Sequence, residues 1–326
     1  MNRPTRKVFI TGGAGFIGSA FTERLLALPQ IERITIFDRN LEHKERLKLK
    51  LNDARISLVT GDLKVPVSVT ESMMGHDTLI HLASNADISR AEKQPTIDFE
   101  EGTLLTQLAL ESARIAGIKR IIYASGSGVY GDRGSDRVRE SDGPFLPIST
   151  YGASKLAGES LISAYCHMFD MKGLAFRFAN IVGLGQTHGI ALDFVEKLLL
   201  NPNELVIMGD GNQTKSYICV NDVFDAVWLA NTNCRETFDI FNVASQDEIS
   251  VREIARIAVE EVLPEGAKID FKYSGKARGW KGDVPVVRMN TEKIRKLGFA
   301  PRFNSEQAIR RAIREIFEIK KAGTMT

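Results

Sequence analysis

Short apolar runs alternate with helical patterns through the first half of the chain. Runs typical of buried strands occupy residues 8–10, 34–37, 56–59, 78–82, 120–124 and 174–177. Helical patterns between and beyond them include residues 16–28, 103–116 and 151–169. Strands that alternate with helices imply right-handed crossovers, so this half predicts a doubly wound parallel sheet of the α/β class. Ligands of such sheets bind beyond the carboxyl ends of the strands.

The alternation changes after Asn180. The second half predicts shorter strands at residues 205–208, 215–218, 238–242 and 269–272, and helices at 222–230 and 251–262. Ser250 and Glu253 fit a capping box at the start of the last helix. These segments are too short for an independent core, so no flexible linker is expected. We predict a larger domain over residues 1–180, with a return segment within 215–245, and a smaller mixed α/β lobe over 181–326.

Composition narrows the function classes. The 326 residues include 43 basic and 41 acidic side chains, and a formal net charge of +2 gives no field for nucleic acid or a membrane. No run approaches the roughly 18 apolar residues that a membrane-spanning helix needs. Cys166, Cys219 and Cys234 share no metal-ligand spacing and cannot all pair, which indicates reduced thiols and no metal. We therefore expect a cytoplasmic protein.

The stretch TGGAGFIG at residues 11–18 lies between the first predicted strand and the first predicted helix. Gly12 permits a tight turn, Gly15 lets the backbone approach a pyrophosphate, and Gly18 lets the helix pack closely on the strand. N–H groups at the helix start would receive the negative charge. The spacing differs from the G-x-G-x-x-G of most dehydrogenases, but the context predicts a dinucleotide-binding turn.

An acidic residue closes the second predicted strand. Asp38 stands about 20 residues beyond the glycine turn, where an acid hydrogen-bonds the ribose hydroxyls of NAD. Arg39 beside it could attract the 2′-phosphate of NADP. The combination favours NAD as the cofactor.

The segment YGASK at residues 151–155 begins a helical pattern, so Tyr151 and Lys155 project on one face. A tyrosine with a pKa of about 10 is almost fully protonated at pH 7. The ammonium of Lys155 and the positive nicotinamide ring of a bound cofactor would favour the phenolate and lower that pKa. The phenolate could then take the proton from a hydroxyl whose carbon gives up hydride. We therefore expect Tyr151 to act as the general base.

These segments together resemble the extended short-chain dehydrogenase/reductase family. The resemblance rests on residues 11–18, Asp62, the VYG at 129–131, residues 151–155, the RFAN at 177–180, the GDG at 209–211 and the GFAP at 298–301. Within that family the chain is most similar to nucleotide-sugar 4-epimerases of the UDP-galactose and UDP-glucuronate type. The resemblance covers nearly the whole chain and implies a Rossmann domain, a tightly held NAD and a lobe that grips a nucleoside diphosphate-sugar.

The resemblance also implies roles for individual residues. NAD would contact Gly12, Gly15, Phe16, Ile17, Gly18, Asp38, Asp62, Leu63, Leu82, Ala83, Ser84, Tyr151 and Lys155, with Asp62 and Leu63 at the adenine. The substrate would contact Asn180, Lys215, Arg278 and Asp283, with Asn180 at the diphosphate and Lys215 in place of an arginine near the phosphates. The helical patterns at 103–116 and 151–169 would form a two-fold four-helix interface, so a homodimer is expected.

Three positions depart from the family pattern. Gly126 replaces the Ser or Thr that usually holds the sugar hydroxyl, which leaves Ser127, the favoured candidate, and Ser125. Gly128 stands where 4,6-dehydratases and decarboxylases carry an acid, and Phe99 stands where an asparagine near the nicotinamide is common.

The sequence therefore predicts an NAD-dependent 4-epimerase in which Tyr151 takes the 4-hydroxyl proton while C4 hydride passes to NAD and returns to the other face. A C4 dehydrogenase, 4,6-dehydratase or decarboxylase is the alternative, and a non-catalytic NAD(H)-sensing protein is a more distant one. For the sugar pocket the sequence offers Asn85, Asp87, Arg90 and His188.

Overall fold

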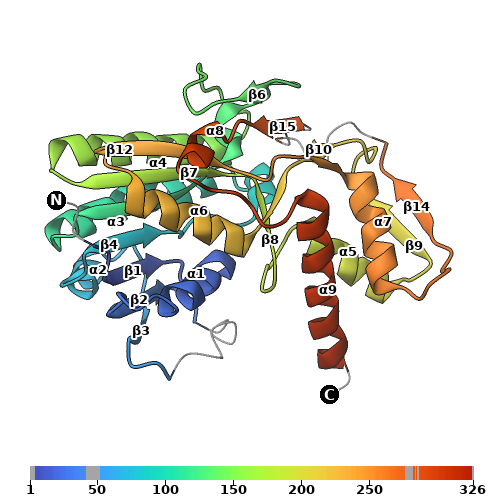
Figure 1. Cartoon of the computed structure of the whole chain (residues 1–326), viewed down its shortest axis with the longest axis horizontal. Helices are drawn as coiled ribbons and strands as arrows, with labels where there is room; N and C mark the ends of the chain where they lie inside the picture. Colours follow the sequence, from blue (N-terminus) through green and yellow to red (C-terminus); the bar gives the residue numbers. More distant parts are fainter. Residues whose placement is uncertain (1–3, 42–51, 276–281, 283, 285, 325–326) are drawn as a thin grey trace.

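A parallel sheet of seven strands forms the larger domain in the computed structural model, which describes residues 4–41, 52–275, 282, 284 and 286–324 (Figure 1). The strand order is β12-β7-β5-β4-β1-β2-β3, and every neighbouring pair is parallel. The strands are β1 (Lys7–Thr11), β2 (Arg33–Asp38), β3 (Ile56–Thr60), β4 (Thr78–His81), β5 (Arg120–Gly126), β7 (Lys172–Phe178) and β12 (Phe238–Val243). The six strands predicted in the first half are confirmed, and so is the doubly wound α/β class.

Helices cover both faces of this sheet. One face carries α1 (Phe16–Leu26) and α6 (Val220–Asn233), and the other carries α2 (Pro66–Met73), α3 (Leu104–Ile115) and α4 (Thr150–Met168). Side chains alternate along β1, so Val8 packs in the core that contains Phe21 of α1, whereas Phe9 packs in the core that contains Ala109 of α3. Both faces are buried, which explains why the strands are continuous apolar runs in the sequence.

The chain returns to the sheet after the smaller lobe has begun. Residues 238–242, predicted among the short strands of the second half, belong to β12, which pairs with β7 at the edge of the seven-stranded sheet. The ring of Phe241 stacks on that of Phe176 with centroids 5.9 Å apart. Both α6 and β12 lie within residues 215–245. This segment therefore completes the larger domain.

The smaller lobe has a hydrophobic core of its own, so the expectation that its segments are too short for one is wrong. Helices α5 (Ile190–Leu200), α7 (Val251–Val262) and α9 (Ser305–Thr324) pack around it, beside the parallel pair β9 (Glu204–Ile207) and β14 (Asp270–Tyr273) (Figure 1). The capping box of Ser250 and Glu253 is present at the start of α7, as predicted.

The prediction of one strand over residues 215–218 is wrong, because these residues are divided between two different sheets. The first sheet contains β13 (Ile249–Ser250), β10 (Thr214–Lys215), β15 (Val286–Met289) and β6 (Arg137–Val138), and the second pairs β11 (Tyr217–Cys219) with β8 (Asn180–Val182). Ser216 marks the break. Its Oγ is hydrogen-bonded to Ser245 Oγ at 2.6 Å, and its carbonyl accepts from the N–H of Asn180 at 3.2 Å. The chain therefore crosses between the sheets beside Asn180.

Three further features bear on function. Cys166, Cys219 and Cys234 form no disulfide. Among the residues that the structure describes, no cluster of His, Cys, Asp or Glu could hold a metal ion. Within the same ranges, no helix has the length and apolar character needed to cross a membrane.

Candidate active site

The glycine-rich turn between β1 and α1 leaves no room for side chains. Gly12 has φ of +67°, and a Cβ on it would lie 2.8 Å from the backbone nitrogen of Ala83. A Cβ on Gly18 would lie 2.6 Å from Gly13 Cα, so α1 packs directly on the turn. Gly15 caps α1 without a side-chain hydrogen bond, ahead of Phe16 and Ile17 in the first helical turn. This glycine cradle and the exposed helix start fit the pyrophosphate of a dinucleotide.

Asp38 ends β2 beside this turn. Its Oδ2 accepts a hydrogen bond from the N–H of Ala14 at 3.1 Å, and its Oδ1 accepts from the N–H of Asn40 at 3.1 Å. The guanidinium of Arg39 pairs instead with Glu101 Oε2 at 2.6 Å. The acid therefore faces the glycine turn while the arginine is held elsewhere, as a site for NAD requires.

The next strand end carries Asp62 and Leu63. Asp62 Oδ1 accepts from the N–H of Lys64 at 2.9 Å, and the Leu63 side chain is buried in the sheet core. The ammonium of Lys64 reaches Glu101 Oε1 at 2.9 Å. Glu101 thus gathers two basic side chains at the edge where the predicted adenine contacts lie.

Lys155 joins the catalytic helix to the ends of β4 and β5. Its Nζ donates to Ser84 Oγ at 3.2 Å and to the carbonyl of Ala124 at 2.8 Å. It lies 5.4 Å from the ring centroid of Tyr151. The other two predicted cofactor contacts after β4, Leu82 and Ala83, directly precede Ser84. The N–H of Leu82 donates to the carbonyl of Thr11 at 3.1 Å.

Burial governs the pKa values of Tyr151 and Lys155. Tyr151 keeps part of its surface accessible, yet protein atoms enclose it closely enough that desolvation, reinforced by the charge of Asp98, raises its pKa to about 12. Desolvation lowers the pKa of Lys155 to about 8, and the carboxylates of Asp98 and Glu159 oppose that fall. The sequence predicted a lowered tyrosine pKa in the presence of the cofactor's positive ring. In the protein alone, burial raises the pKa of Tyr151. The lowered pKa that a phenolate base needs would therefore have to come from bound NAD and substrate.

The two serines beside Gly126 face different surroundings. Ser125 is buried, and its Oγ donates to Glu159 Oε1 at 2.6 Å. Ser127 begins the short helix η4 (Ser127–Tyr130) and is partly accessible. A Cβ on Gly126 would lie 4.0 Å from the hydroxyl oxygen of Tyr151. Position 126 therefore faces the hydroxyl of Tyr151, the predicted general base, without a side chain, and Ser127 stays the predicted partner of the sugar hydroxyl.

A buried ion pair behind these serines was not predicted. Glu159 is 3% exposed and pairs with Arg177, which is 1% exposed, at 2.7 Å between Oε2 and a guanidinium nitrogen. The guanidinium also lies 4.4 Å from the ring centroid of Phe145. Glu159 is one helical turn beyond Lys155, so the spacing of 151, 155 and 159 was the available signal.

The predicted substrate contacts are only partly described. Asn180 opens β8 and Lys215 ends β10, and both lie next to the crossing point at Ser216. Both side chains are partly accessible. Arg278 and Asp283 lie outside the residues that the structure describes. Asn180 and Lys215 are therefore brought together near the junction of the two domains, as a diphosphate site would need.

The candidate sugar-pocket residues also have structural roles. Asp87 caps the short helix η2 (Ile88–Glu92), accepting from the N–H of Ser89 at 3.1 Å. Asn85 is 7% exposed and donates from Nδ2 to the carboxylate of Asp98 at 2.9 Å. The carbonyl of His188 accepts from Gln186 Nε2 at 3.1 Å. Arg90 is exposed.

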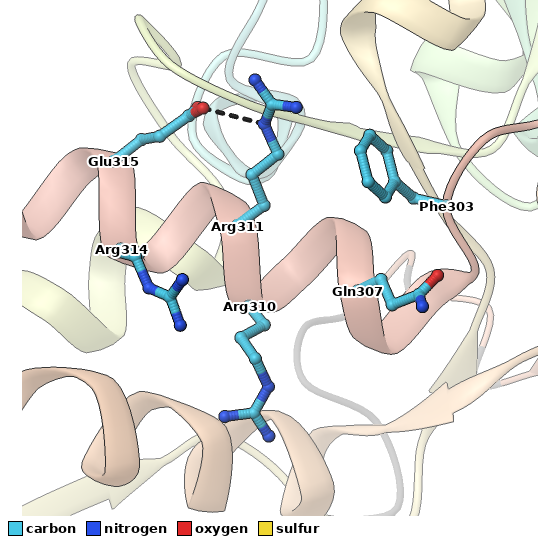
Figure 2. Close-up of a pocket in the computed structure, with 6 residues that line it drawn as sticks. All are labelled: Phe303, Gln307, Arg310, Arg311, Arg314 and Glu315. Atoms are coloured by element: carbon cyan, nitrogen blue, oxygen red, sulfur yellow. Dashed lines mark hydrogen bonds and ion pairs between the residues drawn. The ribbon is translucent and has the colours of Figure 1, made fainter.

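A hollow of about 400 Å³ lies away from these residues, on α9. Figure 2 shows its lining, in which Arg310 and Arg311 point to opposite sides of the helix. Arg310 pairs with Glu261 at 2.9 Å and Arg311 with Glu315 at 2.8 Å. Among the residues that the structure describes, no predicted site residue lines it, and its arginines are neutralised by neighbouring glutamates.

Comparisons with known proteins identify the family of the chain. The model of the NAD dependent epimerase/dehydratase family matches residues 8–244. The chain belongs to this family. It is 31% identical over 254 residues to a UDP-glucose 4-epimerase from Mycolicibacterium smegmatis, which covers 76% of this chain and 80% of that relative.

Solved structures of epimerase/dehydratase proteins share the whole fold. A UDP-galactose 4-epimerase is 31% identical with a TM-score of 0.84, covering 96% of this chain and 99% of that one. A dTDP-glucose 4,6-dehydratase double mutant from Streptomyces venezuelae, solved with NAD bound, is 26% identical with a TM-score of 0.86, covering 97% and 98%. The predicted family is confirmed, and NAD is the cofactor of this enzyme.

Proposed function

We propose that this member of the epimerase/dehydratase family is a 4-epimerase of a nucleoside diphosphate-sugar of the UDP-glucose/galactose or UDP-glucuronate type. Gly128 carries the proposal. A 4,6-dehydratase must also move a proton at C5 and expel the C6 hydroxyl, which calls for a further acid beside the general base. A Cβ at Gly128 would lie 3.5 Å from Gly152 Cα, beside the start of α4, and no acid stands there. Epimerisation at C4 needs only the one base.

The mechanism assigns a distinct task to each side chain. Tyr151 takes the proton of the 4-hydroxyl and later returns it, while Ser127 holds that hydroxyl in place. Lys155, anchored by Ser84 and the carbonyl of Ala124, supplies the positive charge that favours the phenolate. NAD, when bound at the glycine cradle, would supply a reversible hydride acceptor for C4. Asn180 and Lys215 hold the diphosphate.

The sugar has to turn between the two hydride transfers. Contacts at the diphosphate alone leave the 4-keto sugar free to present its other face, so the reaction ends without net oxidation. The relatives named UDP-glucose 4-epimerase and UDP-galactose 4-epimerase support this reading. The dehydratase relative supports the alternative, in which the same first oxidation is followed by loss of water. The Tyr151–Lys155 pair argues against a sensor, which has no use for it.

The assembly in this proposal is a cytoplasmic homodimer. Its interface would be formed by α3 and α4, whose outer faces carry Ile115 at 57% exposure and Met168 at 71% exposure. Burying such side chains against a second copy removes apolar surface from water. The free thiols agree with a reducing compartment. Light scattering at micromolar concentration tests the dimer, and a monomer mass would reject it.

The decisive experiment offers the NAD-loaded protein a panel of UDP-glucose, UDP-glucuronate, UDP-N-acetylglucosamine and GDP-sugars and identifies the products by NMR. Interconversion of C4 epimers without accumulation of NADH is the expected result. A 4-keto-6-deoxy product, or release of carbon dioxide from the uronate, would assign the dehydratase or decarboxylase alternative. Tyr151→Phe is the control that must abolish the product.

A further inference from the structure

Asp98 is a carboxylate buried beside the catalytic pair. It is 1% exposed, and both of its oxygens accept hydrogen bonds. Oδ1 accepts from Asn85 Nδ2 at 2.9 Å, and Oδ2 accepts from Thr150 Oγ1 at 2.6 Å. Asn85 lies in the segment after β4, and Thr150 is the first residue of α4, directly before Tyr151. Asp98 therefore links the segment that carries the candidate sugar contacts to the start of the catalytic helix.

Asn85 extends this link along its own segment. Its Nδ2 also donates to the carbonyl of Asp87 at 2.9 Å, and its Oδ1 accepts from the N–H of Asp87 at 3.1 Å. Asp87 in turn caps η2. Displacement of Asp98 would thus disturb both the segment of residues 85–92 and the residue that precedes the general base.

Asp98 directly precedes a turn of π-helix and takes ordinary α-helical backbone angles. Phe99–Thr103 form the π-turn η3 ahead of α3. Phe99, which the sequence placed near the nicotinamide, is 60% exposed, whereas Asp98 is buried. Such π-turns occur frequently at functional sites.

Hydrogen bonding alone does not require a charge at this position. Both donors, the amide of Asn85 and the hydroxyl of Thr150, are neutral, and a buried charge is costly unless another charge compensates it. The ionisable groups that interact with Tyr151 or Lys155 are Asp98 at the N-cap of η3, Glu159 of α4, His81 of β4 and Tyr123 of β5. Burial lowers the pKa of His81 to about 3 and raises the pKa of Tyr123, so both are neutral. Glu159 is already paired with the guanidinium of Arg177, so Asp98 is the carboxylate that chiefly compensates the ammonium of Lys155.

We propose that Asp98 is a positioning residue of the reaction, whose carboxylate fixes the segment after β4 and the start of α4 around Tyr151 and whose negative charge holds the ammonium form of Lys155. The kinetic tests of this role rest on the proposed 4-epimerase function, and the spectroscopic test does not.

Asp98→Asn removes the charge and keeps the shape of the side chain. We expect kcat to fall about tenfold or more, with KM for the sugar nucleotide raised through the loosened Asn85 segment. The bell-shaped pH profile of kcat should move as a whole to lower pH by roughly one unit, because the charge of Asp98 raises the pKa values of both Tyr151 and Lys155. A purely structural role would lower kcat without moving the profile.

Matched variants separate the charge from the hydrogen bond. Thr150→Val removes one hydrogen bond and keeps the charge, so kcat should fall with an unmoved pH profile, and Thr150→Ser should restore kcat. Glu100→Gln removes a charge two residues from Asp98, in η3, where its electrostatic contact is with Lys64, and should change neither quantity. Wild-type kinetics in Thr150→Val would overturn the positioning role even if Asp98→Asn failed to fold.

The substrate-free test follows the tyrosinate absorbance of the NAD-bound protein against pH. Subtracting Asp98→Asn/Tyr151→Phe from Asp98→Asn isolates Tyr151, and the same subtraction in the wild-type background gives the reference. Ionisation at lower pH in Asp98→Asn is expected, and ionisation at the same pH overturns the electrostatic role. If the wild-type protein epimerises no sugar nucleotide, the proposed function fails while this titration still decides the role of Asp98.

Discussion

Ser125 Oγ lies 2.6 Å from Glu159 Oε1, so the hydroxyl of this serine is turned toward the buried ion pair and away from the sheet edge that carries the cofactor cradle. Glu159 also accepts two hydrogen bonds from Arg177, at 2.9 and 2.7 Å. The serine thus completes a buried polar network between β5, α4 and β7. Its neighbour Ser127 is partly accessible at the start of η4.

Replacing Ser127 should therefore affect turnover, whereas replacing Ser125 should affect stability. Ser127→Ala should lower kcat on the order of tenfold or more, because the 4-hydroxyl loses its partner, and should leave the unfolding free energy nearly unchanged. Ser125→Ala should cost about 2 kcal/mol of unfolding free energy, since a hydrogen bond to a buried carboxylate is lost, with kcat little affected. Steady-state kinetics and urea denaturation of both variants check this. The opposite order of kcat losses would transfer the role to Ser125.

Tyr151→Phe removes only the phenolic oxygen. Turnover should fall by about 10²–10⁴-fold, at the upper end because this oxygen also stabilises developing charge. Folding and NAD affinity should survive, since the ring keeps its packing. Circular dichroism and calorimetric titration with NAD provide those controls. Near-full activity on the true substrate would refute the hydride mechanism.

Lys155→Met should reveal the energetic cost of the buried ammonium. Burial lowers the pKa of Lys155 from 10.5 to about 8, so between these pH values the unfolded chain binds the proton that the folded chain has lost. The unfolding free energy of the wild-type protein therefore gains, from this group, on the order of 3 kcal/mol as pH rises through that window. The variant lacks the gain, so its stability relative to wild type should fall by that amount over the same window. Parallel pH curves in urea denaturation without NAD would contradict the burial argument.

Asp38 should set the cofactor preference. Its carboxylate faces the glycine turn through Ala14, while Arg39 is engaged by Glu101. NAD should thus bind more tightly than NADP, whose 2′-phosphate the carboxylate would repel. Asp38→Ala should narrow the ratio of the two dissociation constants by about tenfold, and Arg39→Ala should leave it nearly unchanged. Tighter NADP binding by the wild-type protein would show that Arg39 dominates.

The elements that depend on local pattern could be predicted from the sequence, and those that depend on distant contacts could not. The parallel strands and the Ser250 capping box follow from residues close in the chain. The division of residues 215–218 does not, because Ser216 is held by Ser245 and Asn180 from other segments. Asp98 was missed for a related reason, since its partners Asn85 and Thr150 come from other segments of the chain. The upward pKa shift of Tyr151 was missed because it reflects burial, which spacing does not reveal.

Gly126 offers the most specific test of how the sugar hydroxyl is held. Its backbone is extended, with φ of −155°, so a side chain is allowed there. An added Cβ would meet only ordinary contacts, with Tyr151 Cε1 at 3.9 Å and its hydroxyl oxygen at 4.0 Å. A serine at this position would therefore place a hydroxyl next to the general base. We expect Gly126→Ser to restore most of the turnover lost in Ser127→Ala.

The matched control in the same background is Gly126→Ala, which adds the Cβ without the hydroxyl. It should leave turnover as low as in Ser127→Ala, because the added methyl group cannot hydrogen-bond to the sugar hydroxyl. Equal rescue by alanine and serine would mean that filling space, and not hydrogen bonding, limits the reaction. No rescue by either would mean that the sugar hydroxyl does not lie between Tyr151 and position 126, and that the hydroxyl contact assigned to Ser127 has to be sought on another element.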